Sequence, residues 1–333
     1  MTPAGLSQAY QAARQHAGLI RRERGLILVS GGDRASYLQG LLTNDISALA
    51  AGQGCYAAYL TAQGRMISDL FVYELGDVIL LALPRDTKDT VLAKLDEFIF
   101  SEDVQLGDVT ETFSAVAVVG PAAASAVSAA TGVSEADLHA MPLHCSRRFE
   151  VGSEPGILLR VADTGEPGFE LVVPREQMPQ VLQSLQAAGA AAIDADTADV
   201  LRIEAGVAVF GPDMDQETIP LEAGIEEQAI SFTKGCYVGQ EVIIRVLHRG
   251  HGRVAQKLVG LLLEPGRSVP APGTALQADG KEVGAVTSSA ESPALGRPIA
   301  LAYLKRDFVA PGTIVQLPAG TATVVALPFV TRS

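Results

Sequence analysis

The chain has 333 residues, of which 48% are hydrophobic and 19% charged, with a formal net charge of −13 and a pI of about 4.8. The length predicts two or three domains, and the composition predicts a globular, soluble fold. The negative charge argues against a nucleic-acid-binding protein, because such a protein needs a basic face to replace phosphate counterions.

The three cysteines, Cys55, Cys145 and Cys236, lie far apart and belong to no CxxC or histidine-rich cluster. Their spacing argues against a structural zinc site and a disulfide framework, and it is typical of a reducing compartment. The N-terminus lacks the apolar core of a secretory signal. Apolar runs such as residues 78–83 are too short to cross a bilayer. We therefore expect a cytoplasmic protein with no membrane contact and no permanently bound metal.

The N-terminal third predicts a strand, a short helix, a hairpin and an amphipathic helix. Residues 27–30 form a short apolar strand, and Asp33 is placed to cap the helix that follows. The segments CYAAYLT and MISDLFVYEL flank a turn at Gly64 and predict a hairpin. After the strand VILLALP, the segment RDTKDTVLAKLDEFIF has apolar residues at helical spacing.

The same design recurs later in the chain. The segment LALPRDTKDTVLAKL, which starts at Leu81, aligns with LVVPREQMPQVLQSL, which starts at Leu171. In each, a proline stops a strand, and an acidic helix start and an apolar helix stripe follow. The alternative is that two unrelated strand-to-helix turns resemble each other by chance. The alignment, however, continues without a gap through both the turn and the helix. We interpret the segments as two related hairpin-plus-helix modules of an α+β core. The aligned positions include Pro84 and Pro174, and Arg85 and Arg175.

The residue pattern changes in the C-terminal part of the chain. Residues 197–206 predict a helix that ends at a glycine, and EVIIRVL predicts a strand after the turn that holds Cys236. From Arg253 onward, short β-prone runs alternate with Gly/Pro turns and predict an all-β barrel or sandwich. We assign residues 1–250 to the α+β core and residues 251–333 to the barrel. Because these parts should cover each other's apolar faces, we expect a monomer.

The segment KGCYVGQEV, residues 234–242, is the most specific stretch of the chain. Gly235 and Gly239 would allow close backbone approach or a positive φ around Cys236. The adjacent Lys234 could lower the pKa of the thiol. The alternative is a small buried cysteine in a turn, which these residues alone favour. Basic residues after the segment could bind an anionic tail or lie on a solvated strand end.

Two carboxylates lie on predicted strands among apolar neighbours. Asp69 shares one face of its strand with Ile67 and Phe71, and Glu170 follows Gly-Phe at the start of another strand. Such an acid either faces solvent or accepts hydrogen bonds from the donor edge of a flat heterocycle. Each acid taken alone is more often a surface residue.

Five segments carry a family resemblance: LQGLLTND (38–45), YLTAQGRMISDL (59–70), GFELVVP (168–174), LRIEAGVAVFGPDM (201–214) and KGCYVGQEV. In this order they resemble the YgfZ family of folate-binding proteins of iron–sulfur cluster assembly and repair, which is related to the glycine-cleavage T-protein, an aminomethyltransferase. The resemblance implies two intertwined α+β lobes and a C-terminal β-barrel around a channel for tetrahydrofolate or a one-carbon derivative. KGCYVGQE is its specific signature.

The resemblance also implies site residues. Glu170 falls on the acid that pairs with the pterin ring, Arg202 on the arginine that faces the acidic part of the folate, and Asn44 in a segment assigned to folate binding. Asp69 falls in the segment of the T-protein's catalytic aspartate, but Ser68-Asp69 replaces the usual two aspartates, which argues against aminomethyl transfer. The implied functional thiol is Cys236, in a motif loop made by Lys234, Gly235, Tyr237, Gly239, Gln240 and Glu241.

The favoured hypothesis is an accessory factor that binds tetrahydrofolate and supports iron–sulfur enzymes, including tRNA-modifying ones, without binding nucleic acid itself. A lone cysteine cannot supply the four thiolates of a typical cluster, so contact with a cluster would be brief or shared. The alternative is a folate-dependent aminomethyltransferase with Asp69 as the acid–base group. A third hypothesis is a thiol-dependent interaction module with a vestigial pocket. Whether the protein is an enzyme stays open on the sequence.

Overall fold

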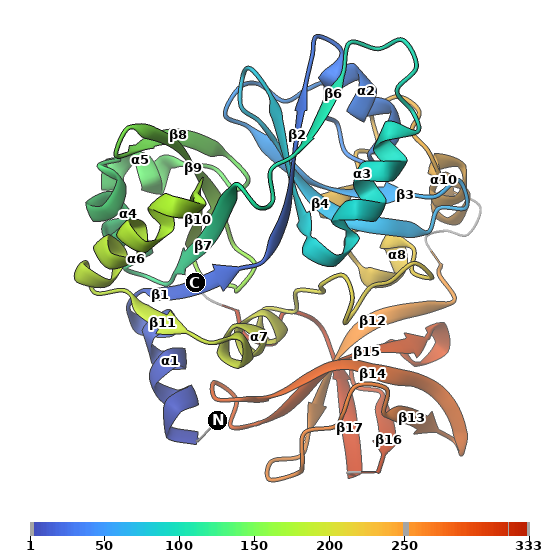
Figure 1. Ribbon diagram of the computed structural model, residues 1–333. Helices are drawn as coiled ribbons and strands as arrows, with labels where there is room; N and C mark the ends of the chain where they lie inside the picture. The colour runs from blue at the N-terminus through green and yellow to red at the C-terminus, as the bar shows by residue number, and fades with distance from the viewer. Residues whose placement is uncertain (1–2, 249–252, 319, 332–333) are drawn as a thin grey trace.

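The computed structural model describes residues 3–248, 253–318 and 320–331. They form two α+β lobes that lie next to each other, with a β-barrel below them in the view of Figure 1. This arrangement confirms the predicted fold class. Among the described helices, none combines the length and the apolar character that a membrane crossing requires.

The first lobe is an antiparallel five-stranded sheet with two helices packed on one face. Its elements are β2 (Arg24–Ser30), α2 (Arg34–Leu41), β3 (Gly54–Leu60), β4 (Met66–Glu74), β5 (Ile79–Pro84), the 3-10 turn η1 (Arg85–Thr87), α3 (Lys88–Asp96) and β6 (Gln105–Asp108). The strand order is β3-β4-β5-β2-β6. Leu38 of α2 and Val91 and Leu95 of α3 pack on the sheet in one buried apolar cluster. The hairpin predicted around Gly64 is present as β3 and β4.

The second lobe is a six-stranded sheet that is also covered by helices. Its elements are β1 (Gly18–Arg22), β7 (Phe113–Val119), α4 (Ala123–Thr131), α5 (Glu135–Ala140), β8 (Ser146–Val151), β9 (Glu154–Val161), β10 (Gly168–Pro174), η2 (Arg175–Gln177), α6 (Met178–Ala187) and β11 (Ala191–Ile193). The strand order is β11-β1-β7-β10-β9-β8, and only the β1–β11 pair is parallel.

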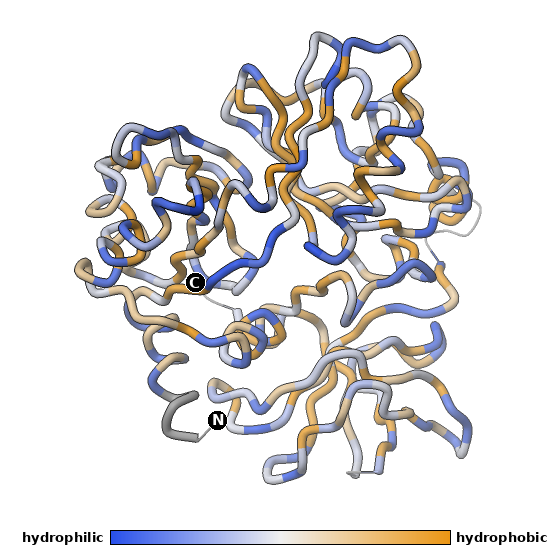
Figure 2. Tube along the Cα trace, in the orientation of Figure 1, coloured by the Kyte–Doolittle hydropathy of each residue, from blue (hydrophilic) through white to orange (hydrophobic). Residues whose placement is uncertain are grey.

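The two lobes are intertwined because the chain crosses between them twice. It leaves the second lobe after β1 and enters the first lobe at β2, and it returns from β6 to β7 through residues 109–112. The two crossings touch, since Val109 N donates to Leu26 O at 3.0 Å and Leu26 N donates to Thr110 Oγ1 at 3.0 Å. In Figure 2 the β1–β2 crossing is a hydrophilic stretch in the middle of the molecule. Polar side chains are thereby placed between the lobes.

Both predicted repeat modules are present. Pro84 ends β5 before η1 and α3, and Pro174 ends β10 before η2 and α6. Proline fixes φ and offers no backbone donor to a continuing ladder, so each strand stops at the same point of its module. Arg85 and Arg175 therefore occupy equivalent positions, each at the start of a 3-10 turn.

The barrel is closed by six strands in the order β12-β15-β14-β13-β16-β17. Closure pairs every strand on both sides and leaves no free sheet edge. The boundary proposed between residues 250 and 251 lies outside the described residues and stays a prediction. The strands are β12 (Gln256–Leu263), β13 (Ala275–Ala278), β14 (Lys281–Ser292), β15 (Arg297–Lys305), β16 (Ile314–Leu317) and β17 (Gly320–Val325), with the turn η3 (Arg306–Phe308) between β15 and β16.

Short helices join the lobes to the barrel: α1 (Pro3–Gln15), α7 (Ala195–Glu204), α8 (Pro220–Ala223) and α9 (Glu226–Ala229). A buried ionic cluster links α1, α7 and the barrel. Glu204 of α7 accepts from Arg14 and from the Tyr10 hydroxyl (2.7 Å) of α1, and from Ser292 of the barrel. Because a buried charge without a partner costs several kcal/mol, this cluster fixes the helix against the barrel.

Two local predictions are wrong. The segment EVIIRVL is not a strand but belongs to the helix α10 (Gln240–His248). Its β-branched residues suggested a strand, but Ile243, Val246 and Leu247 follow helical spacing and pack in one apolar cluster, which decides the matter. Asp33 stands at the N-cap of α2, yet its carboxylate accepts from Asp103 N (2.9 Å) instead of capping the helix.

Candidate functional site

A cavity of about 340 Å³ lies where the β1–β2 crossing passes α7. Arg22 and Arg24 line it from the crossing, Asp163 from the loop after β9, and Arg202 from α7. The wall is therefore built by segments that are distant in the sequence and that meet only because the lobes are intertwined.

Glu170 lies on β10, only 1% exposed, and is held by Arg24. Arg24 donates from Nη2 to Oε2 at 3.1 Å and from Nε to Oε1 at 3.3 Å, which is a two-point contact. Arg22 pairs with Asp163 at 2.6 Å. Burial works to lower the pKa of Arg24, but the charge and hydrogen bond of Glu170, together with the charge of Asp163, outweigh it and raise the pKa. The expected folate-binding acid is thus a buried, ionically paired carboxylate behind a cavity-lining arginine.

Asp69 projects from β4 and is partly buried as a residue, with its Oδ1 atom out of contact with solvent. Its Oδ2 accepts a hydrogen bond from the Tyr56 hydroxyl at 2.7 Å. Its Oδ1 is buried and has no hydrogen-bond partner in the described part of the chain. Burial raises the pKa of Asp69, against the opposing effects of the Tyr56 hydrogen bond and the charge of Arg24. A carboxyl that keeps its proton to higher pH suits acid–base work near neutrality.

Arg24 connects the surroundings of the two carboxylates. Its guanidinium lies 5.6 Å from the centroid of the Phe71 ring, and that ring lies 5.0 Å from the ring of Tyr56. The structure therefore brings Asp69 and Glu170 to one arginine-centred region.

Ser68, which replaces the first aspartate of the usual pair, lies on the other face of β4. It is fully buried, and its hydroxyl lies 2.7 Å from Thr87 Oγ1. Successive side chains of a strand point to opposite faces. The Ser68 side chain thus lies on the face of the strand away from the Asp69 carboxylate, and its hydroxyl also donates to the backbone oxygen of Asp69 at 2.8 Å.

Arg202 lines the cavity but its guanidinium is engaged by the protein. It donates from Nη1 to Asp213 at 2.7 Å, from Nη2 to Ser288 at 2.8 Å and from Nε to Asp199 at 2.5 Å. In this arrangement Arg202 ties α7 to the barrel strand β14. Its contact with the acidic part of a folate stays a prediction.

Lys234 is an anchor of the motif loop. Its Nζ donates to the backbone oxygens of Gln39, Leu42 and Asn44, each at 2.7 Å, around the C-terminal end of α2. A cation in this place satisfies helix carbonyls that lack intrahelical partners. Burial lowers the pKa of Lys234 to about 8. The sequence suggested that the Lys234 ammonium interacts with the thiol of Cys236. In the structure the ammonium instead donates to the three carbonyls.

Cys236 is exposed, which contradicts the alternative of a buried packing residue. The resemblance implies a place for Cys236 beside the folate channel, together with Glu170 and Arg202. Of these three residues only Arg202 lines the 340 Å³ cavity, so that placement stays a prediction. The two glycines differ: Gly239 has φ +85° and a Cβ there would lie 2.5 Å from Thr61 O, whereas Gly235 faces open space. Only Gly239 is required by the backbone. Tyr237 is buried, and Gln240 and Glu241 begin α10.

Asn44 connects the motif region to the Asp69 region. Its Nδ2 donates to Tyr56 O at 2.8 Å and to Gln228 O at 3.0 Å. Its side-chain donors are therefore used by the protein backbone, and a direct contact between Asn44 and folate stays a prediction. The same hydrogen bond helps to fix the strand residue whose hydroxyl holds Asp69.

Sequence reasoning missed three residues that build the site: Arg22, Arg24 and Tyr56. The segment IRRERG, an arginine run directly after a buried strand, was the available signal for the first two. Tyr56 gave no signal of its own, because its register opposite Asp69 depends on the β3–β4 pairing.

Comparisons with known proteins agree with this fold. Residues 3–234 match the model of the GCVT N-terminal domain, and residues 256–331 match that of the glycine cleavage T-protein C-terminal barrel domain. A protein of Rubrobacter xylanophilus named aminomethyltransferase is 33% identical over 95% of this chain and 86% of its own. One of Nostoc sp. with the same name is 31% identical over 98% and 88%. The crystal structure of glycine cleavage system aminomethyltransferase T from Bartonella henselae matches with a TM-score of 0.86 at 25% identity, over 99% of this chain and 91% of that one.

We predict that the stability difference between Asp69→Asn and the wild type depends on pH. Burial raises the pKa of Asp69 in the folded state above the unfolded value of about 3.9. Between the two values the folded state binds more protons, so the wild type loses stability as the pH rises through this window. Urea unfolding between pH 4 and 7 should show Asp69→Asn gaining stability relative to the wild type. A difference that does not change with pH would contradict this assignment. Asp307→Asn, at an exposed aspartate, is the control substitution.

Replacing Lys234 by methionine is expected to loosen the motif loop. Three carbonyls at the end of α2 would lose a charged donor, each such hydrogen bond contributing about 1.5–3 kcal/mol. Ser231 N and Val238 N bond to the same segment of the first lobe, so their amide hydrogen exchange should accelerate by about tenfold or more. Lys257→Met, at a half-exposed lysine, is the control. Unchanged exchange in Lys234→Met would show that other contacts hold the loop.

Proposed function

Since this chain belongs to the glycine cleavage T-protein family, we propose that it binds tetrahydrofolate at the β1–β2 crossing and uses Asp69 as the acid–base group of a one-carbon transfer. The observation that carries the proposal is a buried carboxylate oxygen, Asp69 Oδ1, without a partner in the described structure. It lies in the same arginine-centred region as Glu170. The relatives' name supports an aminomethyl group as the unit transferred.

The residues around Arg24 fit a reduced pterin. A pterin has a flat face and an edge of N–H donors, and the Glu170 carboxylate has lone pairs beyond those that Arg24 uses. Tyr56 and Phe71 supply ring surface nearby. Asp69 Oδ1 supplies a further acceptor, and a ligand donor there would recover the cost of leaving a buried oxygen unpaired.

The chain's own contribution to the reaction is to hold and move a proton. When bound, tetrahydrofolate would supply the nitrogen atoms that accept the one-carbon unit. Tyr56 donates to Asp69 Oδ2 and thereby fixes the orientation of the carboxyl. Oδ1 remains as the atom that takes up or releases the proton. Burial keeps water from this oxygen and raises the pKa of Asp69 above its usual range, which brings its proton exchange closer to neutral pH.

Replacing Glu170 by glutamine is expected to weaken tetrahydrofolate binding by about tenfold or more. A hydrogen bond to a charged acceptor contributes about 1.5–3 kcal/mol, and tenfold in affinity corresponds to about 1.4 kcal/mol. Anaerobic titration calorimetry measures both proteins, with the exposed Glu154→Gln on β9 as the control. Equal affinity of Glu170→Gln and wild type would remove Glu170 from the site. Absence of binding to the wild type would contradict the proposed function.

A second candidate function is the accessory role in iron–sulfur enzyme maintenance that characterises the YgfZ type. It is favoured by Cys236, whose exposed thiol sits on a loop pinned by the buried Lys234. The matched family models cover residues 3–234 and 256–331, so neither includes this cysteine. An accessible thiol on a fixed loop suits brief contact with a partner's metal or thiol. Under this hypothesis folate binding is retained, and the partners are iron–sulfur enzymes, including tRNA-modifying ones.

Two variants separate the candidate functions. A transferase requires that Asp69→Asn loses ammonia release from an aminomethylated lipoyl carrier protein plus tetrahydrofolate, while Cys236→Ser retains it. An accessory role requires the opposite pattern in a strain that lacks the protein, where Cys236→Ser fails to restore iron–sulfur enzyme activity and Asp69→Asn succeeds. If the wild type releases no ammonia and only Cys236→Ser fails in the strain, the accessory role replaces the transferase.

A further inference from the structure

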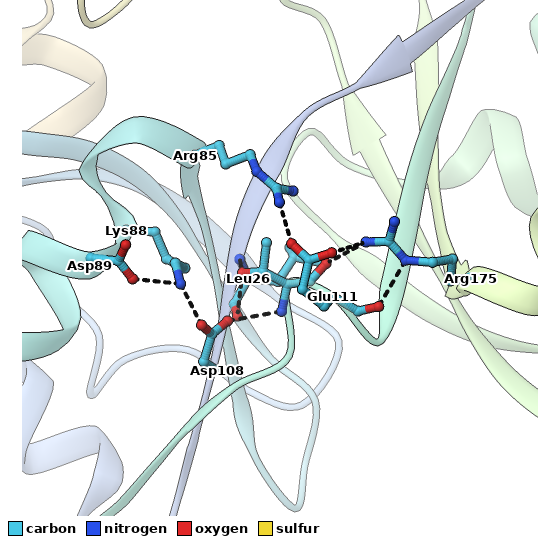
Figure 3. Close-up of polar contacts among 8 residues, drawn as sticks. Leu26, Arg85, Lys88, Asp89, Asp108, Glu111 and Arg175 are labelled. Carbon is cyan, nitrogen blue, oxygen red and sulfur yellow. Dashed lines mark hydrogen bonds and ion pairs between the residues drawn. The ribbon is translucent and has the colours of Figure 1, made fainter.

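Polar contacts between the two lobes differ in how completely their atoms are paired. At one contact, Arg85 and Arg175, one from each lobe, approach the Glu111 carboxylate from opposite sides (Figure 3). Another contact brings residues 52–54 of the first lobe against residues 144–146 of the second. The first contact is a set of ion pairs, whereas the second contains a histidine side chain with an unpaired buried nitrogen.

The backbone of His144 is held in a conformation that is uncommon for a residue other than glycine. Its φ is +63°, in the left-handed region. Its N–H donates to Arg160 O on β9 at 3.1 Å, and a Cβ at Gly54 would lie only 2.6 Å from its carbonyl oxygen. Ser146 N donates to Gly52 O at 2.7 Å just beyond it. Both lobes therefore fix this conformation, and strain maintained in this way is concentrated at functional sites.

The imidazole of His144 reaches the arginine-centred region of the site. Its ring centroid lies 5.3 Å from that of Phe71, the ring that also contacts Tyr56 and the Arg24 guanidinium. Its Nδ1 is buried and has no hydrogen-bond partner in the part of the chain that the structure describes. Leaving a buried polar atom unpaired costs free energy, and a ligand that pairs with Nδ1 would recover this cost.

Burial favours the neutral form of this histidine. It lowers the pKa of His144, against the opposing effect of the Asp163 charge. With its proton on Nε2, the neutral imidazole has a free acceptor at Nδ1. The charged and titratable groups around the imidazole come from several elements: Asp163 after β9, Arg160 of β9, Arg24 of β2, Tyr56 of β3, Tyr73 of β4 and the adjacent Cys145.

We propose that His144 is a specificity-determining residue of the folate site, whose Nδ1 accepts a hydrogen bond from an N–H group of the reduced pterin ring. The inference rests on the proposed function, in which Glu170 binds the N–H donors at the pyrimidine edge of the pterin. The remaining N–H groups of the bicyclic ring belong to its reduced half, and an oxidised pterin lacks them. Because a site built to pair with an N–H rejects a ligand without it, His144 selects the reduced form.

Anaerobic titration calorimetry with tetrahydrofolate and with folic acid tests the inference. His144→Gly removes the imidazole and suits the positive φ, so its tetrahydrofolate affinity should fall about tenfold while its folic acid affinity stays unchanged. His144→Asn places an amide oxygen near the position of Nδ1 and tolerates the same φ, so it should retain the preference for tetrahydrofolate. His139→Asn, at an exposed histidine of α5, is the control and should bind both ligands as the wild type does. An equal loss for the two ligands in His144→Gly would overturn the inference.

The pH dependence of binding is a readout that a purely structural role would not move. Protonation of Nδ1 removes the acceptor, so the wild type should lose tetrahydrofolate affinity as the pH falls through the pKa of His144, below the usual value of about 6.5. His144→Asn carries no group that titrates at this position and should lack this component of the profile. Groups that titrate elsewhere, such as Asp69, contribute equally to both proteins.

NMR spectra of the wild type with isotope-labelled histidine report on Nδ1 without any substitution in the ligand-bound protein. Tetrahydrofolate should shift the Nδ1 signal, assigned through its absence in His144→Asn, and lower the pKa of His144 further, because the bound N–H stabilises the neutral form. If tetrahydrofolate binds and this signal and its titration stay unchanged, the His144 inference fails and the proposed function stands. If tetrahydrofolate does not bind, the proposed function fails and the inference fails with it.

Discussion

The pairing of Arg24 with Glu170 is the interaction on which the middle of the molecule depends. The chain must cross from the second lobe to the first at this point, and the crossing segment carries arginines into a largely buried place. A buried charge without a partner costs several kcal/mol. Glu170 from β10 and Asp163 from the loop after β9 provide the partners, and this pairing fixes the lobes against each other. The cavity and the surroundings of Asp69 follow from that orientation.

The two candidate functions share one scaffold. Lys234 ties the motif loop to residues 39–44, and Asn44 in this segment ties to the backbone of Tyr56, whose hydroxyl holds Asp69. The exposed thiol of Cys236 and the buried acid are therefore carried by the same lobe through a short chain of hydrogen bonds. Neither Asp69 nor Cys236 is among the residues that line the cavity of about 340 Å³.

Arginines gather at the lobe interface although the chain carries a net charge of −13. At a net charge of −13, the field at a distance repels an anionic ligand such as a folate. Attraction must come from cations that lie close to the ligand, where salt screens the distant charges but not the contacts. The arginines of the crossing and of the two repeat modules meet this requirement, because the intertwined topology gathers them from both lobes.

The sequence by itself determined the fold class, the two repeat modules and the barrel, and it singled out Asp69 and Glu170 as candidate acids, although each taken alone was favoured as a surface residue. These features are local, because strand alternation, a proline that ends a strand and helical spacing can each be recognised within a short stretch of sequence. Only the tertiary structure decided that EVIIRVL is helical, that Lys234 binds carbonyls, that Arg202 is engaged by Asp213, and that Arg24 joins the two acids. Each of these depends on contacts between residues far apart in the chain. The energy of a buried charge is set by such neighbours, and no short window of sequence contains them.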